Sequence, residues 1–203
     1  MKREQKRKER DGKKKVLVIV AHPDDETIWM GGTLLMHRGD WKTTIISLCR
    51  RDDEDRAPRF HKACKLYGAR CFMSDLEDEE LEDERVEDAI TRISKFVDDK
   101  FDFIFTHGKN GEYGHKRHID VNKAVVKMLR ERKLRCKCLF LFSYALRARD
   151  CAPRAISDKF INLDALTFMK KKNMIADIYG FKENSFEEKC CKNKEAFDVR
   201  EIR

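Results

Sequence analysis

The sequence lacks any run of about 20 consecutive apolar residues, which is the length that a helix needs to cross a membrane. Its first 15 residues also lack the apolar segment at the centre of a secretory signal. These two absences argue against a membrane-spanning or exported protein. They predict a cytoplasmic location.

None of the eight cysteines forms a C-x-x-C pair, the spacing that is typical of structural zinc sites. We therefore expect the cysteines to be small core residues or free thiols. Two close pairs, Cys136 with Cys138 and Cys190 with Cys191, leave an occasional disulfide open as an alternative.

Positive charge is concentrated at the N-terminus. Residues 1–15 hold nine Lys or Arg against three acidic residues, a local charge of +6 out of +8 for the whole chain. We expect residues 1–14 to form a basic, flexible tail. A nucleic-acid-binding module is the alternative that such a tail suggests. However, no aromatic residues lie between its charges and the rest of the chain is nearly neutral, so we predict no specific nucleic-acid partner.

Strand and helix patterns alternate along residues 15–203, which we expect to form a single catalytic domain. The predicted strands are 15–21, 43–49, 70–73, 101–106 and 138–144, and the predicted helices are 26–37, 56–67, 86–99, 117–130 and 163–179. In the last helix, lysines 170–172 are predicted to form a basic outer face. This order is typical of an α/β fold, a Rossmann-like three-layer sandwich with an open, mostly parallel sheet. Such sheets bind ligands beyond the carboxyl ends of their strands.

Three consecutive carboxylates follow the first predicted strand, in the segment His22-Pro23-Asp24-Asp25-Glu26. At a half-buried strand end such acids repel one another unless a cation or many hydrogen bonds compensate. A divalent metal ion is the simplest compensation. The proline-stiffened turn can point His22 and Asp25 to one side and leave Asp24 facing a water molecule on the metal.

A second polar loop follows the strand predicted at 101–106. It contains His115 and His118, and the start of a helix there would place both imidazoles on one face. One imidazole can then bind a metal ion while the other reaches the substrate. Imidazole and carboxylate are natural zinc ligands, and three protein ligands leave the open position that catalysis requires.

Each loop alone has an equally simple structural explanation. A His-Pro-Asp turn can cap a helix, because an acidic side chain near the N-terminus accepts hydrogen bonds from unpaired N–H groups. Together, however, the two loops supply histidines and aspartates where the active site of an α/β protein belongs. We therefore favour a metal site.

The motif AHPDDE at 21–26, followed by GGT at 31–33 and much later by GHKRH at 114–118, resembles the LmbE-like, or PIG-L, family of zinc-dependent N-deacetylases. The resemblance covers roughly residues 15–125, including the segment RAPRFHKACKLYG at 56–68, and extends more loosely to 172–181. It implies an amidohydrolase that removes the N-acetyl group of an N-acetylglucosamine-type sugar or glycoside, with one zinc ion per chain.

Carried over residue by residue, the resemblance implies that His22, Asp25 and His118 bind zinc. It also implies that Asp24 is the general base and that His115 steadies the tetrahedral intermediate. Removing one such group commonly lowers turnover about 10²-fold or more.

Substrate contacts are predicted at four further positions. Arg56 matches the substrate-binding arginine of the family, although Arg59 stands where relatives more often have a glutamate. His107 closes the strand before the second loop and can line the pocket. Tyr113 and Asn110, in the glycine-rich turn, can contact sugar hydroxyls, although loop chemistry explains the asparagine equally well.

The same metal site can cleave an ester, a phosphoester or a non-sugar amide, because zinc activates water for attack whatever group it meets. The sequence leaves this alternative open. The expected partner is a small acetylated amino sugar or glycoside, and the resemblance also suggests a homo-oligomer, a trimer or hexamer.

Overall fold

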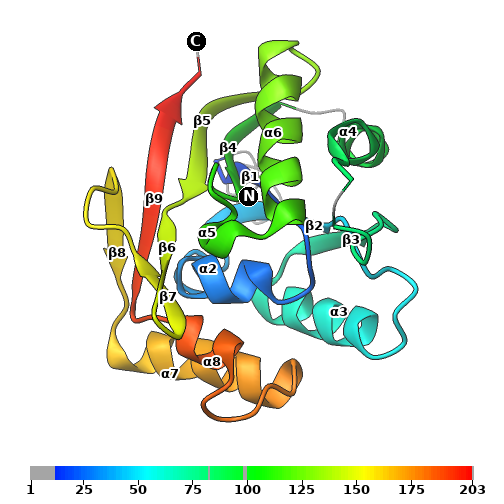
Figure 1. Ribbon diagram of the computed structural model, residues 1–203. Helices are drawn as coiled ribbons and strands as arrows, with labels where there is room; N and C mark the ends of the chain where they lie inside the picture. The colour runs from blue at the N-terminus through cyan, green and yellow to red at the C-terminus, as the bar shows by residue number, and fades with distance from the viewer. Residues whose placement is uncertain (1–11, 82, 98–99, 203) are drawn as a thin grey trace.

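One seven-stranded open sheet runs through the computed structural model of the chain, which describes residues 12–81, 83–97 and 100–202 (Figure 1). The strand order is β3-β2-β1-β4-β5-β9-β8. The strands are β1 Lys14–Val20, β2 Trp41–Ser47, β3 Arg70–Met73, β4 Lys100–Thr106, β5 Arg135–Phe142, β8 Lys159–Asn162 and β9 Lys194–Glu201. Strands β1 to β5 are parallel, and β9 is antiparallel to both β5 and β8. The prediction of a mostly parallel sheet is confirmed.

Strand β1 lies inside the sheet, between β2 and β4, and both of its faces are apolar. Val18 pairs with Ile45 of β2 on one side and with Phe105 of β4 on the other. Residues 16–20 are completely buried. A continuous β-branched run suits a strand that is covered on both faces.

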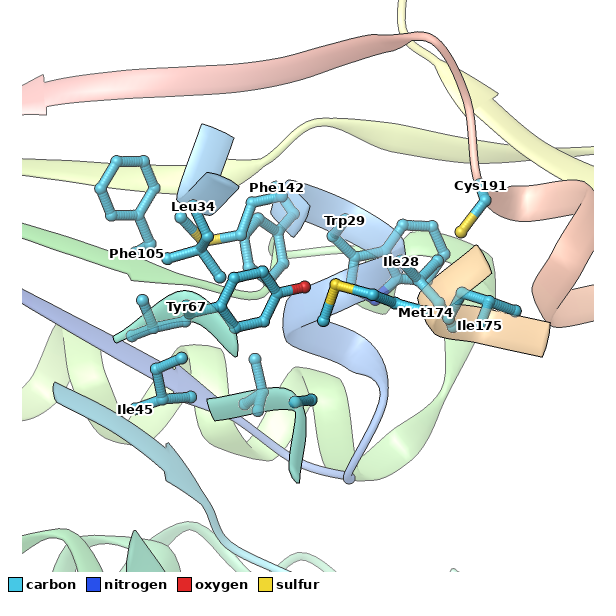
Figure 2. Close-up of a cluster of buried hydrophobic side chains, with 14 of the residues drawn as sticks. Ile28, Trp29, Leu34, Ile45, Tyr67, Phe105, Phe142, Met174, Ile175 and Cys191 are labelled. Carbon is cyan, nitrogen blue, oxygen red and sulfur yellow. The ribbon is translucent and has the colours of Figure 1, made fainter. Parts of the chain in front are cut away.

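Helices on both faces complete three layers (Figure 1). On one face lie α2 Asp25–Met36, α3 Arg56–Tyr67, α8 Phe186–Cys190 and α7 Ala165–Asn173, which continues into a π-helical turn at Met174–Ile178. On the other face lie α4 Val86–Ser94 and α6 Lys116–Arg130. Each face has its own apolar core. Figure 2 shows the first core, in which Trp29, Tyr67 and Phe142 are buried together.

Helix α3 spans the predicted residues 56–67. It ends at Gly68, whose φ of 68° lies in the left-handed region that favours glycine. Strand β3 then begins at Arg70, also as predicted. Local sequence signals are sufficient here because the helix stop and the strand start follow each other directly.

The basic outer face predicted at 170–172 is wrong at its middle residue. Lys171 is completely buried, and its Nζ donates a hydrogen bond to Glu195 of β9 at 2.7 Å. The same carboxylate accepts two backbone N–H groups of α2 at 2.8 Å each, just after the helix is broken at Met30. Glu195 therefore satisfies donors that the broken helix cannot, and Lys171 balances its charge.

Several features at the C-terminal side differ from or add to the prediction. The strand predicted at 138–144 is divided between β5 and the hairpin strand β6 Tyr144–Arg147, which pairs with β7 Asp150–Pro153. Helix α8 and strands β8 and β9 were not predicted. The helix predicted at 86–99 ends at Ser94, and residues 98–99 lie outside the described residues, as do residues 1–11 of the predicted tail. Among the helices that the structure describes, none is long and apolar enough to cross a membrane.

Candidate metal and active site

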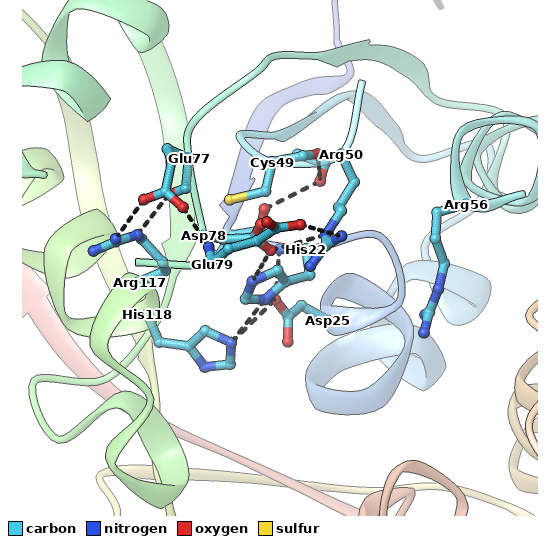
Figure 3. A network of polar contacts seen from close by, with 12 residues as sticks. His22, Asp25, Cys49, Arg50, Arg56, Glu77, Asp78, Glu79, Arg117 and His118 are labelled. Atoms are coloured by element: carbon cyan, nitrogen blue, oxygen red, sulfur yellow. Dashed lines mark hydrogen bonds and ion pairs between the residues drawn. The ribbon is translucent and has the colours of Figure 1, made fainter. Parts of the chain in front are cut away.

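The two polar loops that the sequence singles out meet at the carboxyl ends of the parallel strands β1 and β4 (Figure 3). His22 and Asp24 lie between β1 and α2, and Asp25 is the first residue of α2. His118 lies in the first turn of α6, which follows β4 and the short helix α5 Gly111–Gly114. Because β1 and β4 are parallel neighbours, their carboxyl ends bring these side chains together.

Three polar atoms form a nearly equilateral triangle. Nδ1 of His22 lies 3.2 Å from Nε2 of His118 and 3.3 Å from Oδ2 of Asp25. The Asp25 and His118 atoms are themselves 3.3 Å apart. Ligand atoms about 2.0 Å from a tetrahedral zinc ion are separated by about 3.3 Å. The triangle therefore fits a small divalent ion that keeps a fourth position open.

Other side chains around the triangle can also reach a metal ion. Among the described residues, three overlapping groups are able to hold one, and each contains His22 or His118. The groups are His22, His115 and His118; His22, Cys49 and Asp78; and Asp25, His107 and His118. A buried group of histidines and an aspartate can thus bind a metal here.

A buried glutamate that no sequence pattern indicated orients the second loop. Oε2 of Glu112 lies 2.7 Å from Nδ1 of His118 and 2.8 Å from Nδ1 of His107. Its Oε1 accepts the backbone N–H of Gly108. With Nδ1–H donating to this carboxylate, Nε2 of His118 is left free for a metal ion. Burial raises the pKa of Glu112, but the two imidazoles outweigh burial and hold it below its ordinary value.

The backbone at Glu112 is strained. Its φ of 60° with ψ of −58° lies in a region that side chains other than glycine rarely adopt. Such conformations persist where the surrounding contacts enforce them, and they cluster at functional sites. Here the contacts are the hydrogen bonds that its carboxylate makes to two imidazoles.

His22 has its own carboxylate partner, which no sequence pattern indicated either. Nε2 of His22 lies 3.2 Å from Oδ2 of Asp78, and the same oxygen accepts a hydrogen bond from Nε of Arg50 at 2.9 Å. A carboxylate behind a metal-binding imidazole fixes its ring orientation and increases its basicity. Because His22 meets Asp78 through Nε2, its Nδ1 faces the triangle.

Arg117 holds the loop that carries Asp78. This guanidinium is completely buried and donates hydrogen bonds to the backbone carbonyls of Glu77, Glu80 and Asp83 at 2.6 to 2.8 Å. It also pairs with Asp120 at 2.9 Å. Figure 3 shows Arg117 beside the loop and His118 on the same helix. Successive residues of α6 therefore support the loop and contribute a candidate ligand.

Asp24 is paired with an arginine and not with the atoms of the triangle in the described contacts. Its φ is 109°, and its Oδ2 accepts a hydrogen bond from Nη1 of Arg56 at 2.8 Å. The Arg56 guanidinium lies over the ring of Phe181, 4.9 Å from the ring centroid. Burial and the charge of Asp25 raise the pKa of Asp24 well above its ordinary value, and Arg56 opposes them. A carboxyl with a raised pKa beside a metal site can exchange a proton.

His115 faces the two candidate histidine ligands. Its ring centroid lies 4.8 Å from that of His22 and 4.6 Å from that of His118. Within the part of the chain that the structure describes, its buried Nδ1 has no hydrogen-bond partner. Burial and the charges of His118 and His22 lower the pKa of His115 to about 3. A neutral imidazole therefore lies beside the candidate ligands.

A cavity of about 380 Å³ opens beside these residues. It is lined by His22, Pro23, Asp24, Asp25, Ile28, Trp29, Arg50, Asp53, Arg56, Asp78, Tyr113, His115, Phe186 and Glu187. The wall formed by α8 was not predicted, because that helix follows the segment to which the sequence motifs belong. The volume suits a small polar ligand.

Two of the four predicted substrate contacts line this cavity and two do not. Arg56 and Tyr113 are part of the lining. His107 is completely buried behind Asp25, with Nε2 accepting the N–H of Ala21. Asn110 donates hydrogen bonds to the backbone carbonyls of Glu112 in α5 and Tyr144 in β6. In this structure His107 and Asn110 support the loops around the cavity.

Comparison with models of protein families assigns the chain to one family. Residues 17–129, more than half of the chain, match the PIG-L family, described as GlcNAc-PI de-N-acetylase. The match includes both polar loops and ends within α6. No curated protein sequence matches the chain significantly.

Solved structures show the same fold at low sequence identity. A conserved protein of Thermus thermophilus aligns with a TM-score of 0.66 at 17% identity, over 93% of this chain and 95% of its own. GalB, the 4-carboxy-2-hydroxymuconate hydratase of Pseudomonas putida KT2440, aligns with a TM-score of 0.65 at 14% identity, over 94% of this chain and 96% of its own. The N,N'-diacetylchitobiose deacetylase of Pyrococcus horikoshii, complexed with its inhibitor MPG, aligns with a TM-score of 0.63 at 16% identity. The alignment covers 93% of this chain and 84% of the deacetylase.

Proposed function

The chain belongs to the PIG-L family of de-N-acetylases, and on this basis we propose that it is a zinc-dependent hydrolase that removes the N-acetyl group from an N-acetylglucosamine-containing sugar or glycoside. The observation that carries the proposal is the triangle of His22, Asp25 and His118 at the edge of a cavity that also contains Asp24 and His115. The deacetylase of the same fold from Pyrococcus horikoshii supports the choice of substrate class.

One zinc ion per chain would be held by Nδ1 of His22, Oδ2 of Asp25 and Nε2 of His118. The ion fits this donor set because the three atoms are spaced as tetrahedral ligands are and carboxylates stand behind both imidazoles. When bound, zinc supplies Lewis-acid activation of a water molecule and of the acetyl carbonyl.

Asp24 would act as the general base. Its carboxylate lines the cavity next to Asp25, and it would take a proton from the attacking water and return it to the departing amine. Arg56 orients Asp24 through the 2.8 Å hydrogen bond and opposes the rise in its pKa, which keeps a larger fraction of the carboxyl ionised.

His115 would stabilise the oxyanion that develops on the acetyl carbonyl. Its pKa of about 3 makes the ring neutral at pH 7, so it would donate a single N–H to that oxygen. Oxyanion stabilisation by one positioned donor is commonly worth about 10²-fold in turnover. His115 lines the cavity, which places its ring near the position proposed for the acetyl group.

The sugar would lie in the cavity between Arg56 and Tyr113. Both line it, as do the acids Asp53 and Asp78, which can accept hydrogen bonds from hydroxyl groups. Trp29 is also part of the lining, although it is almost completely buried. We assign His107 and Asn110 to positioning of the loops, and not to direct substrate contact.

Hydrolysis of another amide or of an ester is the second candidate. The hydratase with the same fold shows that this architecture is used for more than one reaction. Released acetate or alcohol would be measured with N-acetylglucosamine, N,N'-diacetylchitobiose and a simple acetate ester. We expect acetate from an acetamido sugar, and turnover of the ester alone would contradict the proposed substrate.

A further inference from the structure

Two cysteines and a histidine come together where helix α3 packs beside β3, the outermost strand on one side of the sheet. His61 and Cys64 are three residues apart on α3, so they lie on the same side of the helix. Cys71 is the second residue of β3, an edge strand that pairs with β2 alone in the described sheet. The turn at Gly68 brings β3 back against α3, and Cys71 packs beside the core that contains Cys64.

Cys71 contacts both of the other side chains. Nδ1 of His61 lies 3.1 Å from Sγ of Cys71. The thiols of Cys64 and Cys71 share a hydrogen bond. Cys64 is 1% exposed, whereas Cys71 is partly exposed. Cys71 is therefore the residue of the pair that small reagents can approach, and Cys64 lies in the core.

The surroundings give the two thiols different roles: Cys64 donates a hydrogen bond and Cys71 accepts it. The hydrogen bond from Cys64, together with the neighbouring His61, lowers the pKa of Cys71 to about 6. Burial, with the bond to Cys71 and the charge of Glu26 on α2, raises the pKa of Cys64 far above its ordinary value. These shifts favour the thiolate form of Cys71 and the thiol form of Cys64.

We propose that Cys71 and Cys64 form a peroxide-reactive pair in which Cys71 is oxidised first and Cys64 then closes a disulfide. A low-pKa, accessible thiol next to a resolving cysteine is the arrangement found in redox-reactive sites. Among the described residues, the groups able to hold a metal ion do not include these side chains. The arrangement therefore fits oxidation and not metal binding.

The chemistry balances with a peroxide as the oxidant. The Cys71 thiolate attacks one oxygen of hydrogen peroxide, the O–O bond breaks, and the other oxygen leaves as hydroxide, which takes a proton to become water. Cys71 is then a sulfenic acid. Cys64 attacks its sulfur, an S–S bond forms, and the hydroxyl leaves as water with the Cys64 proton. The two thiols lose two electrons, and the peroxide is reduced to two waters.

This pair is separate from the candidate active site. Arg56, which contacts Asp24, begins α3, and Cys64 lies eight residues further along the same helix. That separation corresponds to about 12 Å along the helix axis. Substitution of Cys71 is therefore expected to leave deacetylase turnover unchanged.

The direct test uses the full-length protein and hydrogen peroxide. After oxidation, free thiols are blocked by alkylation, the chain is digested, and the peptides are identified by mass spectrometry. We expect a peptide pair linked between Cys64 and Cys71 that disappears after reduction with dithiothreitol. In Cys64→Ser, dimedone should label Cys71 as a sulfenic acid. Cys138, the other cysteine that is not buried, is the internal control and should stay unlinked and unlabelled.

A second measurement follows alkylation of Cys71 by iodoacetamide as a function of pH. We expect the midpoint near pH 6 in the unaltered chain and an upward shift of at least about one pH unit in Cys64→Ala, with a smaller shift in His61→Gln. The groups facing this thiolate are His61 and Cys64 of α3, with Glu26 of α2 acting on Cys64. A midpoint near the ordinary thiol value of about 8.5 in the unaltered chain, or peroxide oxidation without a Cys64–Cys71 link, overturns the proposal.

Discussion

Asp24 and Asp25 are neighbours in the sequence, but their surroundings give them different properties. Burial raises the pKa of both carboxyls. At Asp25 the imidazoles of His118 and His107 outweigh burial and hold the pKa well below its ordinary value, whereas the pKa of Asp24 stays raised. Carboxyls whose environments separate their pKa values commonly divide acid–base and charge-holding roles. We therefore assign metal binding to Asp25 and proton transfer to Asp24.

This division of roles predicts different losses in two variants. Asp24→Ala should keep its metal and lose about 10²-fold or more in turnover, because only the proton acceptor is removed. His118→Ala should lose the metal itself. Metal content by elemental analysis and acetate release would be measured together, with the exposed Asp52→Ala as the control. Full turnover in Asp24→Ala would show that the base is assigned to the wrong residue.

The ion pair between Arg56 and Asp24 predicts a change in pH dependence. A general base works only above its own pKa, so activity is lost as the pH falls through that value. Arg56→Ala removes a charge that lowers the pKa of Asp24, and the acidic limb of kcat/KM should move to higher pH. An acidic limb that stays in place or moves down would show that Arg56 does not act on this carboxyl.

Glu112 predicts a defect in metal affinity. Its carboxylate accepts hydrogen bonds from His118 and His107, and a Gln amide can accept through only one of its two terminal atoms. We expect Glu112→Gln to weaken metal binding about 10-fold to 100-fold, the usual effect of losing a partner behind a metal ligand. Competition titration with a chromophoric chelator would measure it. Unchanged affinity, equal to that of the exposed control Glu131→Gln, would contradict this role.

At the scale of elements, local patterns predicted the parts of the fold whose signals lie within a few residues. The apolar run of β1 and the helix α3 with its Gly68 stop were located closely. Asp78 could not be predicted, because its partner His22 lies on another loop and is brought near only by the finished fold. Glu112 is within six residues of His107 and His118, but the strained backbone conformation that accompanies these contacts has no local sequence signal. The sequence marks them only as polar residues in a glycine-rich turn and an acidic stretch.

The ion pair between α7 and β9 could not be predicted from the sequence for a similar reason. Three consecutive lysines at 170–172 are typical of an exposed face. The buried Glu195 that pairs with Lys171 belongs to β9. The charged residues in the sequence of β9, KEAFDVRE, hide the apolar pattern that would predict a strand. The unpaired donors of α2 explain why a charge is tolerated there.

That ion pair predicts a large effect on stability. Lys171→Met leaves the carboxylate of Glu195 buried without its cation, which commonly costs about 3 to 5 kcal/mol in the free energy of unfolding. Chemical denaturation monitored by circular dichroism would measure the loss. The neighbouring Lys170→Met is the control, because Lys170 is exposed. Equal stability of the two variants would contradict the role given to the pair.

At the scale of the whole molecule, the parallel strands explain why the site is where it is. The carboxyl ends of β1 and β4 place two loops from distant parts of the sequence side by side, and the family match covers both. The basic segment at 1–14, the cytoplasmic location and a trimeric or hexameric assembly stay predictions from the sequence. None of them is needed for the chemistry proposed at the cavity.

The proposed function depends on His22, Asp25 and His118 holding one divalent ion that hydrolysis requires. Elemental analysis of the purified chain, combined with acetate release before and after exhaustive chelation, tests this most directly. We expect one zinc ion per chain, loss of activity on chelation and recovery when zinc is restored. Full activity in protein stripped of metal would contradict it.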